Sequence, residues 1–450
     1  MAGTHPDIAP DRLSAAEIDR NFADLHPPLS KSEALIAADR CYFCYAAPCT
    51  AACPTAIDIP RFIQSIRSGD IEGAAHTILS ENIMGGMCAR VCPTEVLCEQ
   101  ACVRNLHEDR PVDIGLLQRY ATDPMIASGT QLFERAAPSG RRVAVVGGGP
   151  AGLSCAHRLA CLGHAVTVFS RDGKLGGLNE FGIAAYKTVD DFAQREVAYI
   201  LAIGGIEVRT GVTLGGELSL ARLCRDYDAV FLAVGLSGVN RLGLASEDLP
   251  GVLDAVRYIA ELRQAPDKTR LPVGRRIVVI GGGMTAIDVA VQSRHLGAED
   301  VTIVYRRGPE QMGASRYEQD LAQGSGVRIR HWARPTRLLG DAHVSGVGFE
   351  YTRAGPGGVL EGTGETFALP ADIVFKAIGQ EIAWDELGAT GAVLRIARGR
   401  IAVDANRRTS LDNVWAGGDC VAGGKDLTVT AVQDGKLAAQ AIDNYLRSDG

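Results

Sequence analysis

Two stretches of this chain carry the same succession of apolar and glycine-rich positions. In the first, Arg142–Val146 is a short run of mostly β-branched residues that ends in Gly147-Gly-Gly-Pro-Ala-Gly152. The apolar spacing of Leu153–Leu162 then predicts a helix, and Ala165–Phe169 predicts a second strand. A strand, a glycine turn, a helix and a strand in this order are typical of the start of a doubly wound α/β domain.

The second stretch predicts a second unit of the same kind. Arg276–Ile280 is a predicted strand, and Gly281-Gly-Gly-Met-Thr-Ala286 is the turn that follows it. Ile287–Leu296 fits a helix, and Val301–Val304 fits the next strand. Because each such unit binds a mononucleotide, two copies predict two nucleotide sites.

Other short apolar runs place these units in one nested arrangement. Ala229–Gly235 and Asp372–Gly379 are predicted strands that end in glycine. A third glycine-rich element, Val414-Trp-Ala-Gly-Gly-Asp-Cys420, is assigned to the first nucleotide domain, so the second unit is an insertion within the first. The predicted boundaries are 140–245 with 380–450 for the discontinuous first domain and 246–379 for the inserted one.

The first 135 residues follow a different pattern. Ile59–Ser68 and Ile71–Leu79 have apolar spacing near 3.6 residues and no strand alternation, which predicts helices. Ser128–Gly140 is polar and contains glycine and proline, which predicts a linker. The predicted fold is therefore a helical N-terminal domain over 1–135, followed by two nested α/β domains of the Rossmann type.

Net charge and apolar run lengths exclude several classes of function. The chain has 450 residues and a formal net charge of −7, so neither a general nucleic-acid-binding surface nor one for anionic membranes is expected. The N-terminus has no basic start followed by an apolar run, so no secretory signal is predicted. No run is long enough to span a membrane. We therefore expect a cytoplasmic protein.

Cysteines are concentrated in the helical region. Of 12 cysteines, eight lie between Cys41 and Cys102, in the patterns Cys41-x2-Cys44-x4-Cys49-x3-Cys53-Pro54 and Cys88-x3-Cys92-Pro93-x5-Cys98-x3-Cys102. In a reducing compartment, clustered cysteines more often bind metal than form disulfides. Thiolates suit iron–sulfur clusters, and a cysteine before proline often crosses to a second cluster. By this logic Cys41, Cys44 and Cys49 hold one cluster, and Cys53 reaches toward another.

Two alternatives to iron–sulfur binding are weaker. A pair of structural zinc sites favours two CxxC-like pairs in each site, and only Cys41 with Cys44 has that form. A role in packing alone does not explain eight clustered cysteines. The remaining four, Cys155, Cys161, Cys224 and Cys420, are isolated and are expected to be small core residues.

The residues after each turn indicate which nucleotide it binds. The first turn lets the backbone approach a pyrophosphate, and the helix N-terminus faces its charge. The acid that usually binds the ribose is replaced by Ser170, for which Asp172 is a possible substitute. In the second unit, Arg306 and Arg307 stand where such an acid would be. Because guanidinium groups suit a 2′-phosphate, NADPH is favoured and NADH stays possible.

This combination resembles the N-terminal half of dihydropyrimidine dehydrogenase, which in bacteria is a separate subunit, within a wider family that includes the small subunit of glutamate synthase. The resemblance runs from about Ala38 to about Leu446. Its most specific parts are Ala47-Pro-Cys49, Ala52-Cys-Pro-Thr55, Cys88-Ala-Arg-Val-Cys-Pro-Thr94 and Ile114-Gly-Leu-Leu-Gln118.

The resemblance implies two [4Fe–4S] clusters and their ligands. The first cluster would be held by Cys41, Cys44, Cys49 and Cys102. The second would be held by Cys53, Cys92, Cys98 and the side chain of Gln118. Residue counting alone would nominate Cys88 for the last place, and the family pattern makes it a bystander.

The resemblance also implies FAD in the first nucleotide domain and NADPH in the inserted one. The implied FAD positions are Gly147, Gly149, Pro150, Gly152, Gly177, Leu178, Gly418, Asp419 and Thr428. The implied NADPH positions are Gly281, Gly283, Thr285, Ala286, Arg306, Arg307 and Gly379. Lys187 lies where relatives commonly carry an arginine near a proline, and we expect it to take over that contact to the cofactor.

The function implied is that of an oxidoreductase subunit without catalytic acid–base residues of its own, because cofactors carry the chemistry. Electrons would pass from NAD(P)H through FAD and the two clusters to an FMN-containing catalytic subunit that reversibly reduces uracil or thymine to the 5,6-dihydro form. The main alternative is the small subunit of NADPH-dependent glutamate synthase. A stand-alone NADPH-dependent reductase and a zinc-stapled nucleotide sensor are less favoured.

Overall fold

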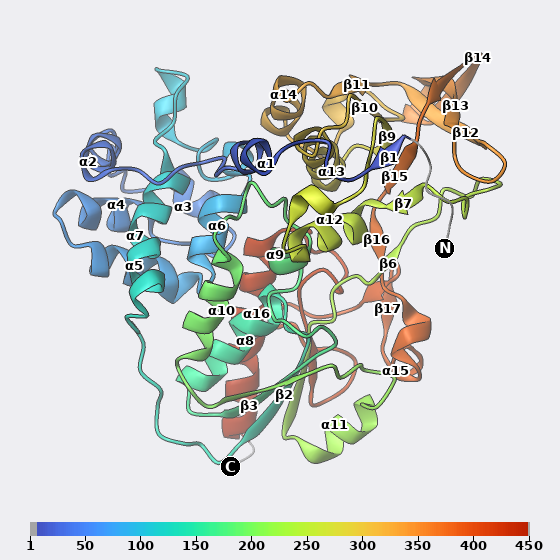
Figure 1. Ribbon diagram of the computed structural model, residues 1–450. Helices are drawn as coiled ribbons and strands as arrows, with labels where there is room; N and C mark the ends of the chain where they lie inside the picture. The colour runs from blue at the N-terminus through green and yellow to red at the C-terminus, as the bar shows by residue number, and fades with distance from the viewer. Residues whose placement is uncertain (1–6, 449–450) are drawn as a thin grey trace. The chain divides into compact units, whose positions relative to one another are not determined.

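The computed structural model describes residues 7–448, and these divide into two compact units (Figure 1). The first unit contains 7–25, Phe181–Val189 and Val239–Gln380. The second contains His26–Glu180, Asp190–Gly238 and 381–448. Each unit is thus assembled from segments that are far apart in the sequence. Residues 7–25 are grouped with the inserted nucleotide domain and not with the helical domain, where they were expected.

The N-terminal part of the second unit is helical, as predicted. Its helices are α2 (Lys31–Asp39), α3 (Pro48–Ala52), α4 (Ile59–Arg67), α5 (Ile71–Glu81), α6 (Gly85–Val91) and α7 (Ile114–Ser128), with short 3-10 turns η1 (Thr94–Val96) and η2 (Val103–Leu106). Asp58 and Asp70 cap α4 and α5 by accepting hydrogen bonds from backbone N–H groups in the first turn. The apolar faces of α4 and α7 meet in a core that includes Phe62, Ile63 and Leu117.

The rest of the second unit is built on a five-stranded parallel sheet. Its strand order is β19 (Val414–Ala416), β5 (Ala229–Leu232), β2 (Arg142–Val146), β3 (Ala165–Ser170) and β4 (Ile206–Thr210). The helices are α8 (Pro150–Cys161), α9 (Leu178–Phe181, whose last residue is grouped with the first unit), α10 (Phe192–Leu201), α11 (Leu220–Asp226) and α16 (Thr428–Ser448). Because β19 pairs with β5, the third glycine-rich element belongs to the first nucleotide domain, as predicted.

A smaller region of the second unit follows the inserted domain. It contains η6 (Trp384–Leu387), α15 (Thr390–Val393) and the pair β17 (Ile396–Ala397) and β18 (Arg400–Ile401). The short strands β6 (Gly238–Val239) and β16 (Gln380–Glu381) mark the two places where the chain passes into and out of the inserted domain.

The helical part and the sheet part of the second unit share one hydrophobic core. Met84 and Met87 at α6 and Ile126 on α7 belong to the same buried cluster as Leu153 on α8 and Phe192 on α10. Burying apolar area is the main favourable term in folding. The helices that carry the cysteines are therefore packed directly onto the first nucleotide domain.

The first unit contains the second parallel sheet, in the order β11 (Arg328–Arg330), β10 (Asp300–Val304), β9 (Arg276–Gly281), β15 (Ile373–Ala377) and β7 (Val252–Asp254). Its helices are α1 (Ala15–Asn21), α12 (Ala255–Gln264), α13 (Met284–His295) and α14 (Arg316–Gly324), with 3-10 turns η3 (Lys268–Arg270) and η4 (Pro309–Gln311). The strand β1 (Ile8–Ala9) pairs with β8 (Val273–Gly274). These elements confirm the second Rossmann-type unit.

One element of the first unit was not predicted from the sequence. The strands β12 (Ala333–Leu339), β13 (Gly346–Ala354) and β14 (Leu360–Pro370, preceded by η5, Pro356–Gly358) form a three-stranded antiparallel sheet. Much of β14 is exposed, so its apolar alternation is weak. Among residues 7–448, no helix combines the length and apolar character that crossing a membrane requires.

Candidate functional site

The first glycine turn has the close backbone contacts that its sequence predicts. Gly147 has φ +116°, and a Cβ on it would lie 2.0 Å from the carbonyl oxygen of Ala233. A Cβ on Gly152 would lie 1.9 Å from the carbonyl oxygen of Gly147. Gly149 is the N-cap of α8 and Pro150 follows at the first helical position, without a side-chain cap. The first N–H groups of α8 are thus left for a ligand.

The other predicted FAD positions of the second unit lie around this turn. A Cβ on Gly177 would be 2.8 Å from Gly149 Cα, and one on Gly418 would be 3.0 Å from Ala151 Cβ. Thr428, at the start of α16, donates a hydrogen bond from Oγ1 to Asn179 Oδ1 at 2.8 Å. The loops containing Gly177 and Gly418 therefore converge on the N-terminus of α8.

Leu178 and Asp419 complete the predicted FAD set. Leu178 is 38% exposed and precedes the buried Asn179. Burial, together with the nearby carboxylate of Asp426, raises the pKa of Asp419 to about 6. Hydrogen bonding by a ligand hydroxyl would lower the cost of keeping this carboxylate charged.

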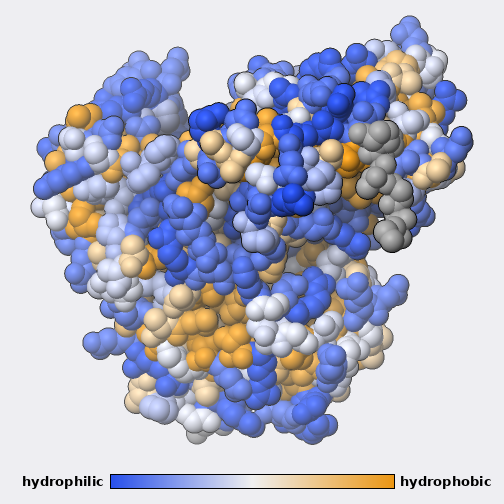
Figure 2. Space-filling model, in the orientation of Figure 1, coloured by the Kyte–Doolittle hydropathy of each residue, from blue (hydrophilic) through white to orange (hydrophobic). Residues whose placement is uncertain are grey.

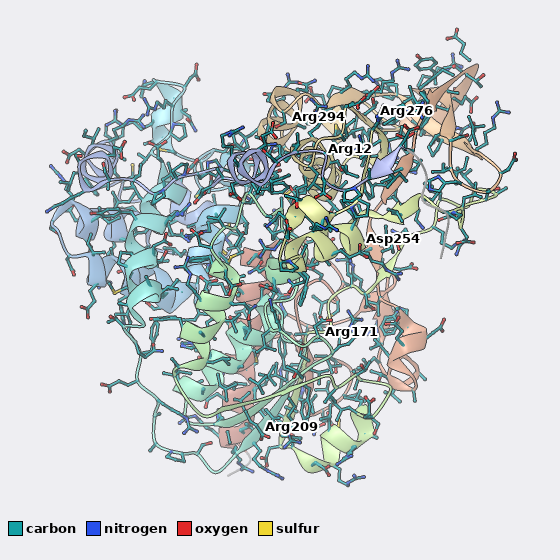
Figure 3. The ribbon with its side chains drawn as sticks, viewed as in Figure 1. Arg12, Arg171, Arg209, Asp254, Arg276 and Arg294 are labelled. Carbon is teal, nitrogen blue, oxygen red and sulfur yellow. The ribbon has the colours of Figure 1, made fainter. Side chains whose placement is uncertain are left out.

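Ser170 lies at the end of β3, where the ribose-binding acid was expected. Its side chain is buried, and its Oγ would lie 3.2 Å from a Cβ on Gly148. The next two residues form a charged group: Arg171 lies 3.6 Å from Asp172 and 3.6 Å from Glu386, and Figure 3 labels Arg171. The acid nearest the expected position is thus engaged by an arginine.

The second glycine turn has the same design in the first unit. Gly281 has φ +149°, and a Cβ on it would lie 2.1 Å from the carbonyl oxygen of Ala377. Gly283, the N-cap of α13, has open space where a Cβ would be. Thr285 and Ala286 lie in the first turn of α13, which has no side-chain cap. The open position is the one where a pyrophosphate would approach the helix.

Arg306 and Arg307 follow β10, next to this turn. Arg306 is exposed and Arg307 is half-buried. Their backbone carbonyls accept hydrogen bonds from Thr352 and Trp332, which fixes the loop. Gly379, two residues beyond β15, has φ +95°, and a Cβ on it would lie 3.1 Å from Asn240 Nδ2.

Lys187 belongs to a buried ion network in the first unit. Its Nζ lies 2.8 Å from Asp288 Oδ1 and 2.8 Å from Glu318 Oε1, and all three residues are buried. Burial alone would lower the pKa of Lys187, but the two carboxylates outweigh burial and raise it. Sequence reasoning missed Asp288 and Glu318, because a carboxylate on a helix carries no signal of a distant partner. A contact between Lys187 and FAD stays a prediction.

The first predicted cluster set comes together in the structure. Cys41, Cys44, Cys49 and Cys102 line one pocket. Burial raises the pKa of the Cys41 thiol, and the neighbouring thiols of Cys44 and Cys102 raise it further. Burial likewise raises the pKa of Cys49 to about 11. Since metal ligation requires thiolates, bound cations would stabilise this arrangement.

The second predicted set gathers beside α6. The pKa of the Cys92 thiol is held well above its ordinary value. The largest cause is a hydrogen bond with Cys88, followed by burial and by the neighbouring thiols of Cys98 and Cys53. Gln118 is buried on α7, and its Nε2 donates to the carbonyl oxygen of Gly85 at 2.6 Å. This bond orients the amide and leaves its oxygen available as a ligand. The thiol of Cys88 also lies within hydrogen-bonding distance of Cys92.

A site for a single ion and a site for a cluster differ in how closely their ligands gather. Within residues 7–448, no three His, Cys, Asp or Glu side chains lie close enough together to hold one metal ion. A tetrahedral zinc site requires four ligands about 2.0–2.3 Å from one ion. Sulfurs around a cluster of several irons are spread more widely.

Comparisons with known proteins agree with this organisation. Residues 18–130 match the family model described as "Dihydroprymidine dehydrogenase domain II, 4Fe-4S cluster", and residues 141–435 match "Pyridine nucleotide-disulphide oxidoreductase". The second match covers well over half of the chain. The chain belongs to the pyridine nucleotide-disulphide oxidoreductase family.

Two curated relatives of this pyridine nucleotide-disulphide oxidoreductase match it along most of their length. The NAD-dependent dihydropyrimidine dehydrogenase subunit PreT of Salmonella typhimurium is 36% identical over 95% of this chain and 98% of the relative. The glutamate synthase [NADPH] small chain of Escherichia coli is 35% identical over 94% of both chains. In fold, FprA from Mycobacterium tuberculosis covers 68% of this chain with a TM-score of 0.58 at 20% identity, over 85% of its own length.

Family membership confirms the class of enzyme and its cofactors. This pyridine nucleotide-disulphide oxidoreductase is an NAD(P)H-dependent flavin and iron–sulfur enzyme, with FAD, NADPH and [4Fe–4S] clusters as cofactors. The glycine turns and thiol sets described above fit these groups. The assignment of individual residues to each cofactor stays a prediction.

Proposed function

We propose that this chain is the electron-input subunit of a dihydropyrimidine dehydrogenase. It would take electrons from NAD(P)H and deliver them to an FMN-containing catalytic subunit that reversibly reduces uracil or thymine to the 5,6-dihydro form. The observation that carries the proposal is the nearly full-length similarity to PreT, a protein named as a subunit of that enzyme. The convergence of the predicted cluster ligands into two sets supports it.

The residues of the second unit would hold the flavin and both clusters. The N-terminus of α8 and the loops containing Gly177 and Gly418 would bind FAD. Cys41, Cys44, Cys49 and Cys102 would hold the first cluster, and Cys53, Cys92, Cys98 and Gln118 the second. FAD and the clusters together supply the conversion of a two-electron hydride into single electrons.

The protein's own contribution is to position and enclose these groups. The backbone of the turn at Gly147–Gly152 presents N–H donors to a pyrophosphate. The hydrogen bond from Gln118 to Gly85 orients a ligand amide, and such supporting bonds tune metal sites. The shared core of α6, α7, α8 and α10 excludes water between the cysteine-bearing helices and the flavin domain.

Exposed apolar side chains beside the cysteines support the expectation of a partner. Tyr42, Tyr45, Val96 and Leu106 are between 46% and 107% exposed, and they flank cysteines of both sets in the sequence. Figure 2 shows that apolar residues also gather on the lower part of the visible face. Exposed apolar patches commonly mark interaction sites.

The decisive experiment pairs the purified chain with candidate acceptors under anaerobic conditions. NADH and NADPH oxidation would be followed with an FMN-containing dihydropyrimidine dehydrogenase catalytic subunit, with and without uracil or thymine. We expect pyrimidine-dependent oxidation and formation of the dihydropyrimidine. A stable complex with a glutamate synthase large chain, and oxidation that depends on glutamine and 2-oxoglutarate, would overturn the proposal.

That second outcome corresponds to the competing function. The small chain of glutamate synthase is nearly as similar over a comparable length, so it is the specific alternative. The cofactor sites would be unchanged under it, because only the acceptor differs. The acceptor experiment therefore separates the two without testing the cofactors.

A further inference from the structure

A buried threonine contacts one of the proposed cluster cysteines. Thr55 is 0% exposed, and its Oγ1 lies 3.3 Å from Cys53 Sγ. A cysteine bound to a cluster is a thiolate and has no proton to donate. The Thr55 hydroxyl would therefore donate to the sulfur. Hydrogen bonds to sulfur are among the factors that set the reduction potential of a cluster.

A positive charge is held at the backbone of the same threonine. Lys436 on α16 donates from Nζ to the Thr55 carbonyl oxygen at 3.0 Å and pairs with Glu81 Oε2 at 2.7 Å. The side chain of Lys436 is 18% exposed, whereas that of Glu81 is 45% exposed. Water therefore screens the carboxylate more than the ammonium group. The ammonium group of Lys436 therefore outweighs the carboxylate locally and stabilises the extra negative charge that a cluster gains when it is reduced.

The sulfur contact is not an automatic result of the local sequence. Cys53-Pro54-Thr55 recurs as Cys92-Pro93-Thr94, and both cysteines are proposed ligands of the second cluster. The hydroxyl of Thr94 instead bonds the carboxylate of Glu99. The tertiary structure has thus given one of two identical tripeptides a contact to sulfur.

We propose that Thr55 and Lys436 raise the reduction potential of the cluster held by Cys53 and so favour electron entry into it. This inference rests on the proposed electron-input function. The step moves one electron from the reduced flavin to the oxidised cluster, with no bond made or broken. Because α16 begins at Thr428, a predicted FAD position, one helix would support both the donor site and the acceptor site.

The test is a redox titration of the full-length chain, purified without oxygen and followed by electron paramagnetic resonance. Thr55→Val removes the hydroxyl while preserving shape, and Thr55→Ser restores it. Thr77→Val is the matched control, because the hydroxyl of Thr77 bonds the carbonyl of Gly73 within α5. In Thr55→Val we expect the equilibrium constant for one-electron reduction of one cluster to fall about three- to tenfold. This corresponds to a reduction potential that is lower by about 30–60 mV.

The lysine is tested in the same titration. Lys436→Gln should shift the same cluster in the same direction, and Lys436→Arg should remain near the parent value because the charge is kept. Iron and sulfide content is measured for each variant, so that loss of a cluster is not mistaken for a shift in its reduction potential. Full iron content with an unchanged potential in Thr55→Val overturns the inference alone. A parent chain without two distinct cluster signals overturns the proposed electron path instead.

Discussion

Burial alters the chemistry of single residues in this protein, and Glu196 on α10 is the clearest case. Its side chain is fully buried, and its Oε1 accepts a hydrogen bond from the backbone N–H of Met87 at 3.0 Å. Burial raises the pKa of Glu196 to about 8, despite that bond and the nearby charge of Arg90. The carboxyl is therefore mostly protonated at neutral pH, inside the core that joins the cysteine-bearing helices to the flavin domain.

This shift predicts a pH-dependent stability. An unfolded glutamate loses its proton near pH 4.3, so between there and about pH 8 the folded chain binds more protons than the unfolded chain. The contribution of Glu196 is thus present at low pH and is lost as pH rises through this window. Glu196→Gln should flatten the decline by up to about 1.4 kcal/mol per pH unit. Denaturant unfolding at several pH values measures this, and equal slopes in both proteins would refute it.

At the same scale, we predict that Arg306 and Arg307 decide which nicotinamide nucleotide binds. We expect the double change to Ala to weaken NADPH binding about 10- to 150-fold, from the loss of charge-assisted hydrogen bonds, and to leave NADH binding nearly unchanged. Isothermal titration with both nucleotides measures this. Arg316→Ala is the control, because Arg316 pairs with Asp320 on α14. A similar loss for NADH would show that the arginines do not read the 2′-phosphate.

At the scale of elements, each nucleotide turn uses its glycines for two different purposes. Gly147 and Gly281 have positive φ and would place a Cβ against the carbonyl oxygens of Ala233, just after β5, and Ala377, at the end of β15, so a side chain there would destabilise the fold. Gly149 and Gly283 have open or ordinary space around them, so they are free for a ligand. The same short sequence would thus serve both the sheet and the cofactor.

This division predicts opposite effects of one substitution at two positions in the second turn. Gly281→Ala should destabilise the fold by about 1–3 kcal/mol, because its Cβ would collide with the carbonyl of Ala377. Gly283→Ala should leave stability nearly unchanged and weaken NADPH binding at least about tenfold, because its Cβ enters the space for the pyrophosphate. Thermal unfolding and nucleotide titration of both variants test this. Normal nucleotide affinity in Gly283→Ala would place the pyrophosphate elsewhere.

At the scale of the whole molecule, the second unit combines the cysteine-bearing helices and the first nucleotide domain in one packed body. The helices carrying the cysteines share buried residues with α8 and α10, and Lys436 on α16 bonds both Thr55 and Glu81. Ligands that bind the native state stabilise everything that folds with it. Loss of a cluster should therefore also lower the stability of the first nucleotide domain.

We predict that Cys53→Ser, which removes a proposed ligand of the second cluster, lowers the temperature at which FAD is released. Flavin fluorescence during heating measures the release, and iron analysis confirms the loss of one cluster. Cys88→Ala is the matched control, since Cys88 is a proposed bystander in the same helical part. If Cys88→Ala loses the cluster and Gln118→Leu retains it, then Cys88 is the fourth ligand.

The local pattern of the sequence determined the two Rossmann-type units and the helices at Ile59–Arg67 and Ile71–Glu81. Apolar periodicity and glycine turns act over a few residues, so they can be read directly. The same holds for the cysteine pattern, because its local spacing by itself predicted iron–sulfur clusters. The spacing of the glycine-rich element at Val414–Cys420 gave only a weak indication of the nested order, and the pairing of β19 with β5 places that element in the first nucleotide domain.

Only the tertiary structure decided which distant groups meet. The ion network of Lys187 with Asp288 and Glu318, and the contact of Thr55 with Lys436, join segments up to hundreds of residues apart. The antiparallel sheet of β12–β14 was likewise invisible, because its exposed strands lack a clear apolar face. Sequence patterns predict which residues of an element face the core. Which residues of different elements contact each other depends on how those elements pack. The physical reason is that burial leaves a local signature and pairing does not.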